Sequence, residues 1–321
     1  MAAAADPDHG GVELVESEEP FRTNALLIIL KALKLSHNRP HSFVFVDEIL
    51  HSIFFLGNIN TPPHSPKDIV NVPEVFEALL DCYPRPFKLF SSQVPKRSPF
   101  SCVLDMVVQV TREQEREQEE RNIIRQLRNI INEVDPSGSR KLISSTICVS
   151  QRENSPLSTR YYGVSMSTHR RQIPIGASCL SNWQTFVANA VMTYYPHMTK
   201  KPYFDGTFTL KPEVRCVAFD LLREQEEEMA EEVVKPPCRS CGNLYGLATR
   251  EVKEFTYGNC AEAESLSNLL RNERASTIIS SRREYSERNL QRAKTQVEND
   301  LKSFLKMPQD IRVTFYTPET E

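Results

Sequence analysis

Apolar residues recur three and four positions apart through much of the chain before residue 135. This spacing places them on one face of a helix, so it predicts a mostly helical region with buried faces. The last predicted helix opens with a charged run, so we expect its first half to be solvated and its second half to pack. The helices that we predict in this region cover residues 21–35, 46–56, 73–82 and 112–134, and residues 103–110 are either a strand or the start of the last helix. Four prolines within residues 83–99 predict a loop there.

The pattern changes after residues 135–138, which combine proline and glycine in a turn-forming sequence. Two β-rich segments, 142–150 and 160–167, follow with a polar turn between them and predict a hairpin. Strands and helices then alternate, which favours an α/β fold, with α+β as the alternative. The further elements that we predict are helices at 180–194, at 217–232, ending near 272 and at 286–305, and strands at 203–210 and 311–316.

These patterns divide the chain into three parts. We expect a disordered acidic tail at residues 1–20, a mostly helical region at 21–135 and a layered α/β domain at 136–321. The charged run within residues 112–121 is either a solvated helix face or a surface for protein partners of the helical region.

Composition and charge narrow the function classes. Hydrophobic residues make up 40% and charged residues 25% of the 321 residues, which is typical of a globular chain. The formal net charge is -3, so only a local patch could draw the protein to nucleic acid. No apolar run approaches the roughly 20 residues that span a bilayer, and residues 1–20 lack the pattern of a secretory signal. We therefore expect no membrane association and a location in the cytoplasm or nucleus.

Eight cysteines are too few for a disulfide scaffold in a chain of this length, and three of them lie close together as Cys238, Cys241 and Cys260. A Cys-x-x-Cys motif lets two thiolates reach one metal ion. A third thiolate then makes a three-ligand zinc site with one open position, which is the catalytic pattern. Zinc in an open site acidifies its water, and a carboxylate two residues from a ligand can move the released proton. Glu262 stands in that place.

The two motifs Pro237-Cys238-x-x-Cys241 and Cys260-Ala261-Glu262 resemble those of the zinc-dependent nucleobase and nucleoside deaminases. The resemblance covers a short part of the chain, and the two motifs occur here in the reverse of the family's order. It implies that Cys238, Cys241 and Cys260 bind zinc. It also implies that Glu262 moves protons between a zinc-bound water and the base of a nucleobase, nucleoside or nucleotide, with ammonia as the leaving group. The predicted hairpin within 142–167 suits the family's first two strands.

Other interpretations of the same residues remain open. Asn259 and Glu262 have the spacing of a capping box at a helix start, which is compatible with a catalytic role for the glutamate. The cysteines could also be a redox pair or plain buried thiols. A fourth ligand would make the zinc structural, and the chain would then be a non-enzymatic interaction or regulatory protein. The upstream candidates for that ligand are His169, Cys179, His197 and Cys216.

A basic stretch, Arg271–Lys294, carries more arginine and lysine than acidic residues. It is either a solvated helix face or a surface that contacts a phosphate-bearing substrate or a nucleic-acid strand.

Overall fold

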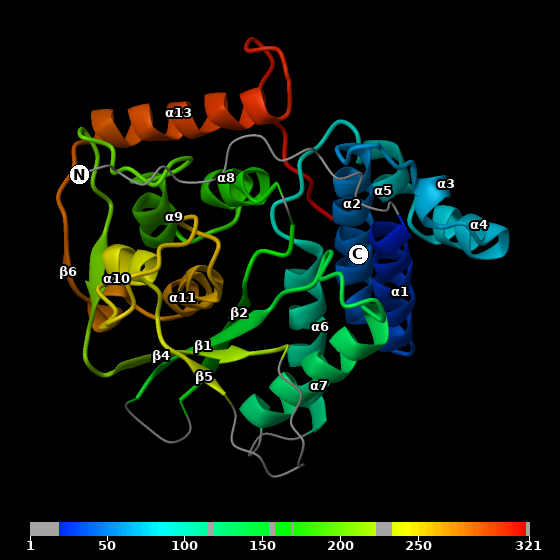
Figure 1. Cartoon of the computed structure of the whole chain (residues 1–321), viewed down its shortest axis with the longest axis horizontal. Helices are drawn as coiled ribbons and strands as arrows, with labels where there is room; N and C mark the ends of the chain where they lie inside the picture. Colours follow the sequence, from blue (N-terminus) through cyan, green and yellow to red (C-terminus); the bar gives the residue numbers. More distant parts are fainter. Residues whose placement is uncertain (1–18, 115–118, 154–157, 169, 223–232, 319–321) are drawn as a thin grey trace, which may run out of the picture.

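Helices and antiparallel strands are interleaved along the chain, which confirms the α/β fold class. Figure 1 shows the computed structural model, which describes residues 19–114, 119–153, 158–168, 170–222 and 233–318. The predicted acidic tail at 1–20 lies outside the described residues except for its last two, which begin the first helix.

Helices form the region before residue 135, as the apolar periodicity predicts. The three helices predicted first are confirmed as α1 (Glu19–Ser36), α2 (Phe43–Asn58) and α4 (Pro73–Cys82). None of the helices that the structure describes is both long enough and apolar enough to cross a bilayer.

Proline begins several short helices that the sequence did not indicate. The loop prediction for residues 83–99 is wrong at its start, where α5 (Pro84–Leu89) forms. Proline suits the first turn of a helix because its missing N–H would have no partner there. The turn η1 (Pro40–Ser42) and helix α3 (Pro66–Ile69) begin in the same way.

Residues 103–110 are helical rather than a strand, but the prediction of one long helix that ends at 134 is wrong, because the segment forms two helices that pack together. Helices α6 (Pro99–Gln114) and α7 (Glu119–Val134) pack together, and the Gln126 side chain donates to Thr111 Oγ1 across the pair (3.2 Å). The apolar stripe of α7 is buried, as predicted, and consists of Ile123, Ile124, Leu127, Ile130, Ile131 and Val134.

The predicted hairpin is confirmed as strands β1 (Thr146–Arg152) and β2 (Arg160–Val164). They belong to an antiparallel sheet of order β2-β1-β4-β5, which β4 (Val214–Asp220) and β5 (Val234–Lys235) complete. The helix predicted at 217–232 is wrong in its first residues, because β4 pairs with β1 in the middle of the sheet. The later residues of that prediction lie outside the described part of the chain.

Both faces of this sheet are covered, and β1 shows how. Successive side chains of a strand point to opposite faces. Ile147 and Val149 belong to the core that includes the apolar residues of α6 and α7. Ser150, on the other face, shares a hydroxyl hydrogen bond of 2.8 Å with Ser265 of helix α11 (Ala261–Asn272). Figure 1 shows α6 and α7 on one side of the sheet and α11 on the other. The core is therefore continuous across residue 135.

Further helices surround α11 in the second part of the chain. The predictions of a helix ending near 272 and of one at 286–305 are confirmed by α11 and by α13 (Glu287–Phe304). The helix predicted at 180–194 is interrupted at residues 182–184. There the Gln184 side chain accepts a hydrogen bond from the Phe186 N–H and caps a new helix. The remaining helices are α8 (Gln172–Ser181), α9 (Thr185–Met192), α10 (Arg239–Tyr245) and α12 (Ala275–Ile278).

A small second sheet lies at the edge of this layer. The strand predicted at 203–210 shortens to β3 (Phe208–Leu210), which pairs antiparallel with β6 (Ile279–Arg282). Residues 204–207 of the predicted segment have no regular structure.

The end of the chain docks on the N-terminal helices. The strand predicted at 311–316 is reduced to one parallel bridge, between Val94 and Phe315. The next residue, Tyr316, is buried and donates from its hydroxyl to Asp47 Oδ1 (2.6 Å). The C-terminal segment therefore ties α13 back to α2.

Candidate metal centre

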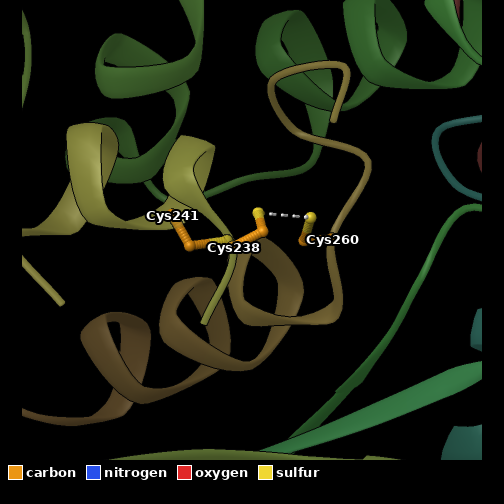
Figure 2. A group of neighbouring side chains, drawn as sticks. All are labelled: Cys238, Cys241 and Cys260. Atoms are coloured by element: carbon orange, nitrogen blue, oxygen red, sulfur yellow. Dashed lines mark hydrogen bonds between the residues drawn. The ribbon is translucent and has the colours of Figure 1, made fainter. Parts of the chain in front are cut away.

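Two helix starts bring Cys238, Cys241 and Cys260 together (Figure 2). Cys238 is the N-cap residue of α10, Cys241 lies in the first turn of that helix, and Cys260 is the N-cap residue of α11. Their sulfur atoms all lie within 4.8 Å of one another, and the Sγ atoms of Cys238 and Cys260 are 3.5 Å apart. A tetrahedral zinc ion with Zn–S bonds of about 2.3 Å holds its sulfur ligands about 3.8 Å apart. The spacing therefore fits one metal ion.

Glycines in the intervening chain let the two helix starts meet. Helix α10 ends at Gly246, whose φ of 67° is a left-handed conformation that glycine adopts without steric cost. A Cβ atom there would also stand 2.7 Å from the side chain of Thr209. The chain returns along α10 and turns again at Gly258, with a φ of 87°. This second turn delivers Cys260 to the cluster.

The sulfur atoms share hydrogen bonds that favour one thiolate. The pKa of Cys238 falls to about 2, because the side chains of Cys241 and Cys260 donate to its sulfur, as do the backbone N–H groups of Cys241 and Ser240. The contact with Cys238 raises the pKa values of the other two thiols. The N-terminus of α11 adds the positive end of a helix dipole. A bound cation would take the place of the shared protons.

Glu262 lies in the first turn of α11, directly beside this cluster. Its side chain is buried, with 5% of the residue exposed, and its carboxyl interacts with the side chain of Cys241. Burial raises the pKa of Glu262, and the negative charge of Cys238 adds to this effect. A carboxyl whose pKa moves toward neutrality can both accept and donate a proton near neutral pH. The geometry is therefore compatible with the predicted proton transfer.

The capping box expected from Asn259 and Glu262 is wrong. The N-cap residue of α11 is Cys260, and no side chain caps the helix. Asn259 instead precedes the cap, and its Oδ1 atom is buried without a hydrogen-bond partner. Its side chain is thus available for another contact.

The expected fourth-ligand candidates lie elsewhere, as far as the structure describes them. Cys216 contacts Cys148 on the neighbouring strand, with 3.6 Å between the sulfur atoms. Cys179 belongs to α8, and His197 lies in the turn after α9. His169 is outside the described residues. Among the residues that the structure describes, the cluster comprises three ligands.

A group of polar atoms near Cys260 was not indicated by the sequence. The backbone N–H of Met166 donates to the carbonyl oxygen of Asn259 (2.9 Å), which brings the end of β2 beside the start of α11. Ser165 and Ser167 flank Met166, and both hydroxyl oxygens are buried without a partner. A strand in the core usually carries apolar side chains. The two serines at the end of this strand were therefore the feature of the sequence that could have indicated the polar group.

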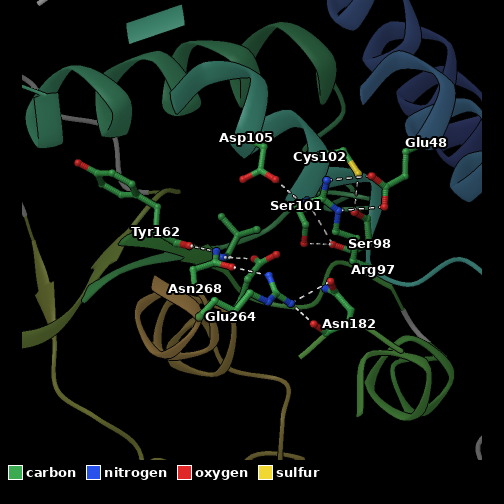
Figure 3. Close-up of polar contacts among 12 residues, drawn as sticks. Glu48, Arg97, Ser98, Ser101, Cys102, Asp105, Tyr162, Asn182, Glu264 and Asn268 are labelled. Carbon is green, nitrogen blue, oxygen red and sulfur yellow. Dashed lines mark hydrogen bonds and ion pairs between the residues drawn. The ribbon is translucent and has the colours of Figure 1, made fainter. Parts of the chain in front are cut away.

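A second buried carboxyl on α11, Glu264, connects this helix to the N-terminal region (Figure 3). Its Oε2 accepts a hydrogen bond from the backbone N–H of Val164 (2.8 Å). Burial raises the pKa of Glu264 to about 7, and the nearby Asp105 adds to this effect, whereas Arg97 opposes it. Arg97 bridges Asp105 and Glu48, with 2.8 Å between its Nη2 and Glu48 Oε2. No spacing in the sequence indicates this network, because its members come from distant parts of the chain.

The basic side chains of Arg271–Lys294 make separate contacts within the protein. Arg271 donates to the carbonyl oxygen of Asn182. The guanidinium of Arg292 lies 3.8 Å from the ring centroid of Tyr203. The use of this stretch for nucleic-acid contact remains a prediction.

The three thiols are placed so that they could hold one metal ion. Three thiolates suit zinc and other thiophilic metals, so the chemical identity of the ion is a separate question. Comparisons with protein-family models, curated proteins and solved structures give no match to this chain.

Proposed function

We propose that the protein is a zinc-dependent hydrolytic deaminase that acts on a nucleobase, nucleoside or nucleotide. One observation carries this proposal: the buried carboxyl of Glu262 lies against a three-cysteine cluster formed by two helix starts. Three thiolates leave one position of a tetrahedral zinc open, and a general acid–base stands beside it. The reverse order of the two motifs along the chain does not prevent their meeting in space.

The proposed reaction replaces an exocyclic amino group by oxygen: the base and one water give the carbonyl product and ammonia. When bound, zinc would lower the pKa of the attacking water. Cys238, Cys241 and Cys260 would hold the ion. Glu262 would carry the first proton of the water to a ring nitrogen of the base, and the second proton, from the hydroxyl so formed on the base, to the leaving amino group. Its burial beside the thiolates supports this role, because it favours the protonated carboxyl between the two transfers.

The polar atoms beside Cys260 support a substrate that is bound by hydrogen bonds. Ser165, Ser167 and Asn259 present buried atoms that have no partner in the protein. Buried polar atoms without partners are costly, so such atoms are commonly satisfied by a ligand or water. The edge of a nucleobase offers the matching donors and acceptors.

The alternative is a structural metal site in a non-enzymatic interaction or regulatory protein. The burial of Cys241, with 1% exposed, favours this interpretation, because structural sites are closed to solvent. All eight cysteines are free thiols in the structure, and both functions fit a reducing compartment such as the cytoplasm or nucleus.

Metal content and product formation decide between these functions. The wild type is compared with Cys260→Ala and Glu262→Ala for bound zinc, and for ammonia release from cytosine, adenine and guanine compounds. We expect about one equivalent of zinc in the wild type and in Glu262→Ala, its loss in Cys260→Ala, and activity in the wild type alone. Zinc without ammonia release from any of these compounds would support the structural function. A wild type without zinc would refute both.

A further inference from the structure

The segment between the two cysteine motifs, residues 247–256, forms a loop fixed to the first turn of α10; we call it the rim loop. The backbone N–H of Arg239 donates to the carbonyl oxygen of Lys253 (3.0 Å). The hydroxyl of Ser240 donates to the carbonyl oxygen of Phe255 (2.6 Å) and accepts from its N–H (3.0 Å). The rim loop is therefore held by the same helical turn that carries Cys238 and Cys241.

The outer side of this turn and loop carries three cations and two carboxylates. Arg239, Arg250 and Lys253 are exposed. None of the described carboxylates forms an ion pair with these three side chains. Glu251 and Glu254 of the same loop are exposed as well, and Glu254 Oε1 accepts hydrogen bonds from Asn243 (3.2 Å) and Tyr257 (3.3 Å). The three cations outnumber the two carboxylates, so this surface is positive on balance although the whole chain has a net charge of -3.

An aromatic ring stands among these cations. Phe255 is 37% exposed, and the Lys253 ammonium lies 4.7 Å from its ring centroid. An exposed ring next to cations is the combination that single-stranded nucleic acids require. Their bases stack on aromatic side chains, and their phosphates contact lysine and arginine.

We propose that the rim loop binds the sugar–phosphate backbone of a single-stranded nucleic acid and stacks one of its bases on Phe255. This proposal rests on the proposed function and narrows its substrate to a base within a strand. A free nucleobase or nucleoside has no charge for the three cations to bind. A mononucleotide has one phosphate group, whereas cations on both α10 and the loop suit successive phosphates of a strand.

The test measures strand binding directly, with fluorescein-labelled 12-mers of DNA and RNA in an anisotropy titration at several salt concentrations. The rim variant is Arg239→Ala/Arg250→Ala/Lys253→Ala. Its matched control removes three cations from α13, as Arg288→Ala/Arg292→Ala/Lys294→Ala. Since each phosphate contact adds about 0.7 to the slope of log K against log salt, we expect the rim variant to lose about 2 from this slope. Phe255→Ala is expected to weaken binding about tenfold with the slope unchanged. The control is expected to bind as the wild type does.

Three results would overturn the proposal. The wild type could bind neither strand, the α13 control could lose binding while the rim variant keeps it, or unlabelled mononucleotide could compete as well as unlabelled strand. Circular dichroism of each variant checks that it is folded. Binding needs neither zinc nor turnover, so Cys260→Ala is expected to keep it. A failed ammonia assay with retained strand binding would therefore contradict the proposed function and leave the rim loop assignment standing.

Discussion

Gly163 of β2 and Ala261 of α11 are in direct contact: a Cβ atom at Gly163 would stand 2.7 Å from the carbonyl oxygen of Ala261. It would stand even closer, at 2.3 Å, to the backbone nitrogen of Ser265. Backbone atoms of a helix cannot yield as the end of a flexible side chain can. The missing side chain at Gly163 therefore lets α11 lie against the sheet and sets the position of Cys260.

Gly163→Ala is expected to push the start of α11 away from the sheet. We expect the free energy of unfolding to fall by about 1–3 kcal/mol. We also expect zinc to bind more weakly, because Cys260 moves away from Cys238. Denaturant melts and a zinc competition titration measure both effects. Gly138→Ala is the control, because no atom lies within 4 Å of its Cβ position and its φ of 64° adds only local strain. Wild-type zinc affinity in Gly163→Ala would contradict this account.

Glu264 is expected to make stability depend on pH. Its pKa of about 7 in the folded protein lies above the ordinary value of 4.5, so the folded state binds the proton more tightly than the unfolded state. The free energy of unfolding should therefore be highest below pH 4.5 and fall as pH rises toward 7, by up to about 3 kcal/mol. Burial is the main cause of the raised pKa of Glu264, and the groups that face its carboxyl are Asp105, Arg97 and Ser101.

The measurement is a set of denaturant melts between pH 5 and 8. The side chain in Glu264→Gln is uncharged at all of these pH values. The variant should therefore lack the decline in the free energy of unfolding that Glu264 causes. Glu74→Gln, in the exposed first turn of α4, should keep the wild-type profile. Parallel profiles for the wild type and Glu264→Gln would show that Glu264 does not titrate in this range.

Arg97 is expected to be one of the most sensitive positions of the N-terminal region. Arg97→Ala leaves the partly buried carboxylates of Glu48 and Asp105 without their bridge. Removing one partner of a buried ion pair costs about 3–5 kcal/mol. Lys31→Ala, which breaks the more exposed pair with Glu133, should cost about 1 kcal/mol or less. Chemical denaturation of both variants tests the contrast, and equal losses would contradict it.

Ser167→Ala and Asn259→Ala are expected to weaken the use of substrate without reducing the stability of the protein. Neither side-chain oxygen has a partner in the protein, so its removal breaks no internal hydrogen bond. Stability and zinc content should stay near wild type, while kcat/KM for the substrate found by the ammonia assay should fall about tenfold.

The control for these two variants is Ser144→Ala. The Ser144 hydroxyl donates to the carbonyl oxygen of Ser165 (2.6 Å), so its removal should reduce stability by about 1 kcal/mol. Unchanged kcat/KM in both Ser167→Ala and Asn259→Ala would remove these residues from the substrate site.

Local signals in the sequence predicted local structure well. The helix α13 begins where Ser286 caps it, and α7 buries the stripe that its spacing indicated. Interactions between distant segments were the ones missed. Residues 217–219 have apolar side chains that fit a helix as well as a strand, and only the pairing with β1 selects the strand. The fold-back between α6 and α7 was hidden within a charged run.

In the candidate site, too, features set by local sequence were predicted, whereas features made by distant segments were missed. The spacing of the cysteines predicted a cluster, and the structure brings the three sulfur atoms together. Glu264 could not be recognised, because its environment is made by Val164 and Arg97, which approach only in the folded chain. Asn259 was misjudged because a cysteine can occupy an N-cap position when other contacts fix the helix start.

The contact between Tyr316 and Asp47 joins residues 269 positions apart. During synthesis, α2 emerges from the ribosome long before its partner exists. The N-terminal helices therefore lack this contact until Tyr316 has been synthesised. The helix at residues 43–58 thus gains one of its buried contacts only after most of the second part of the chain has been made.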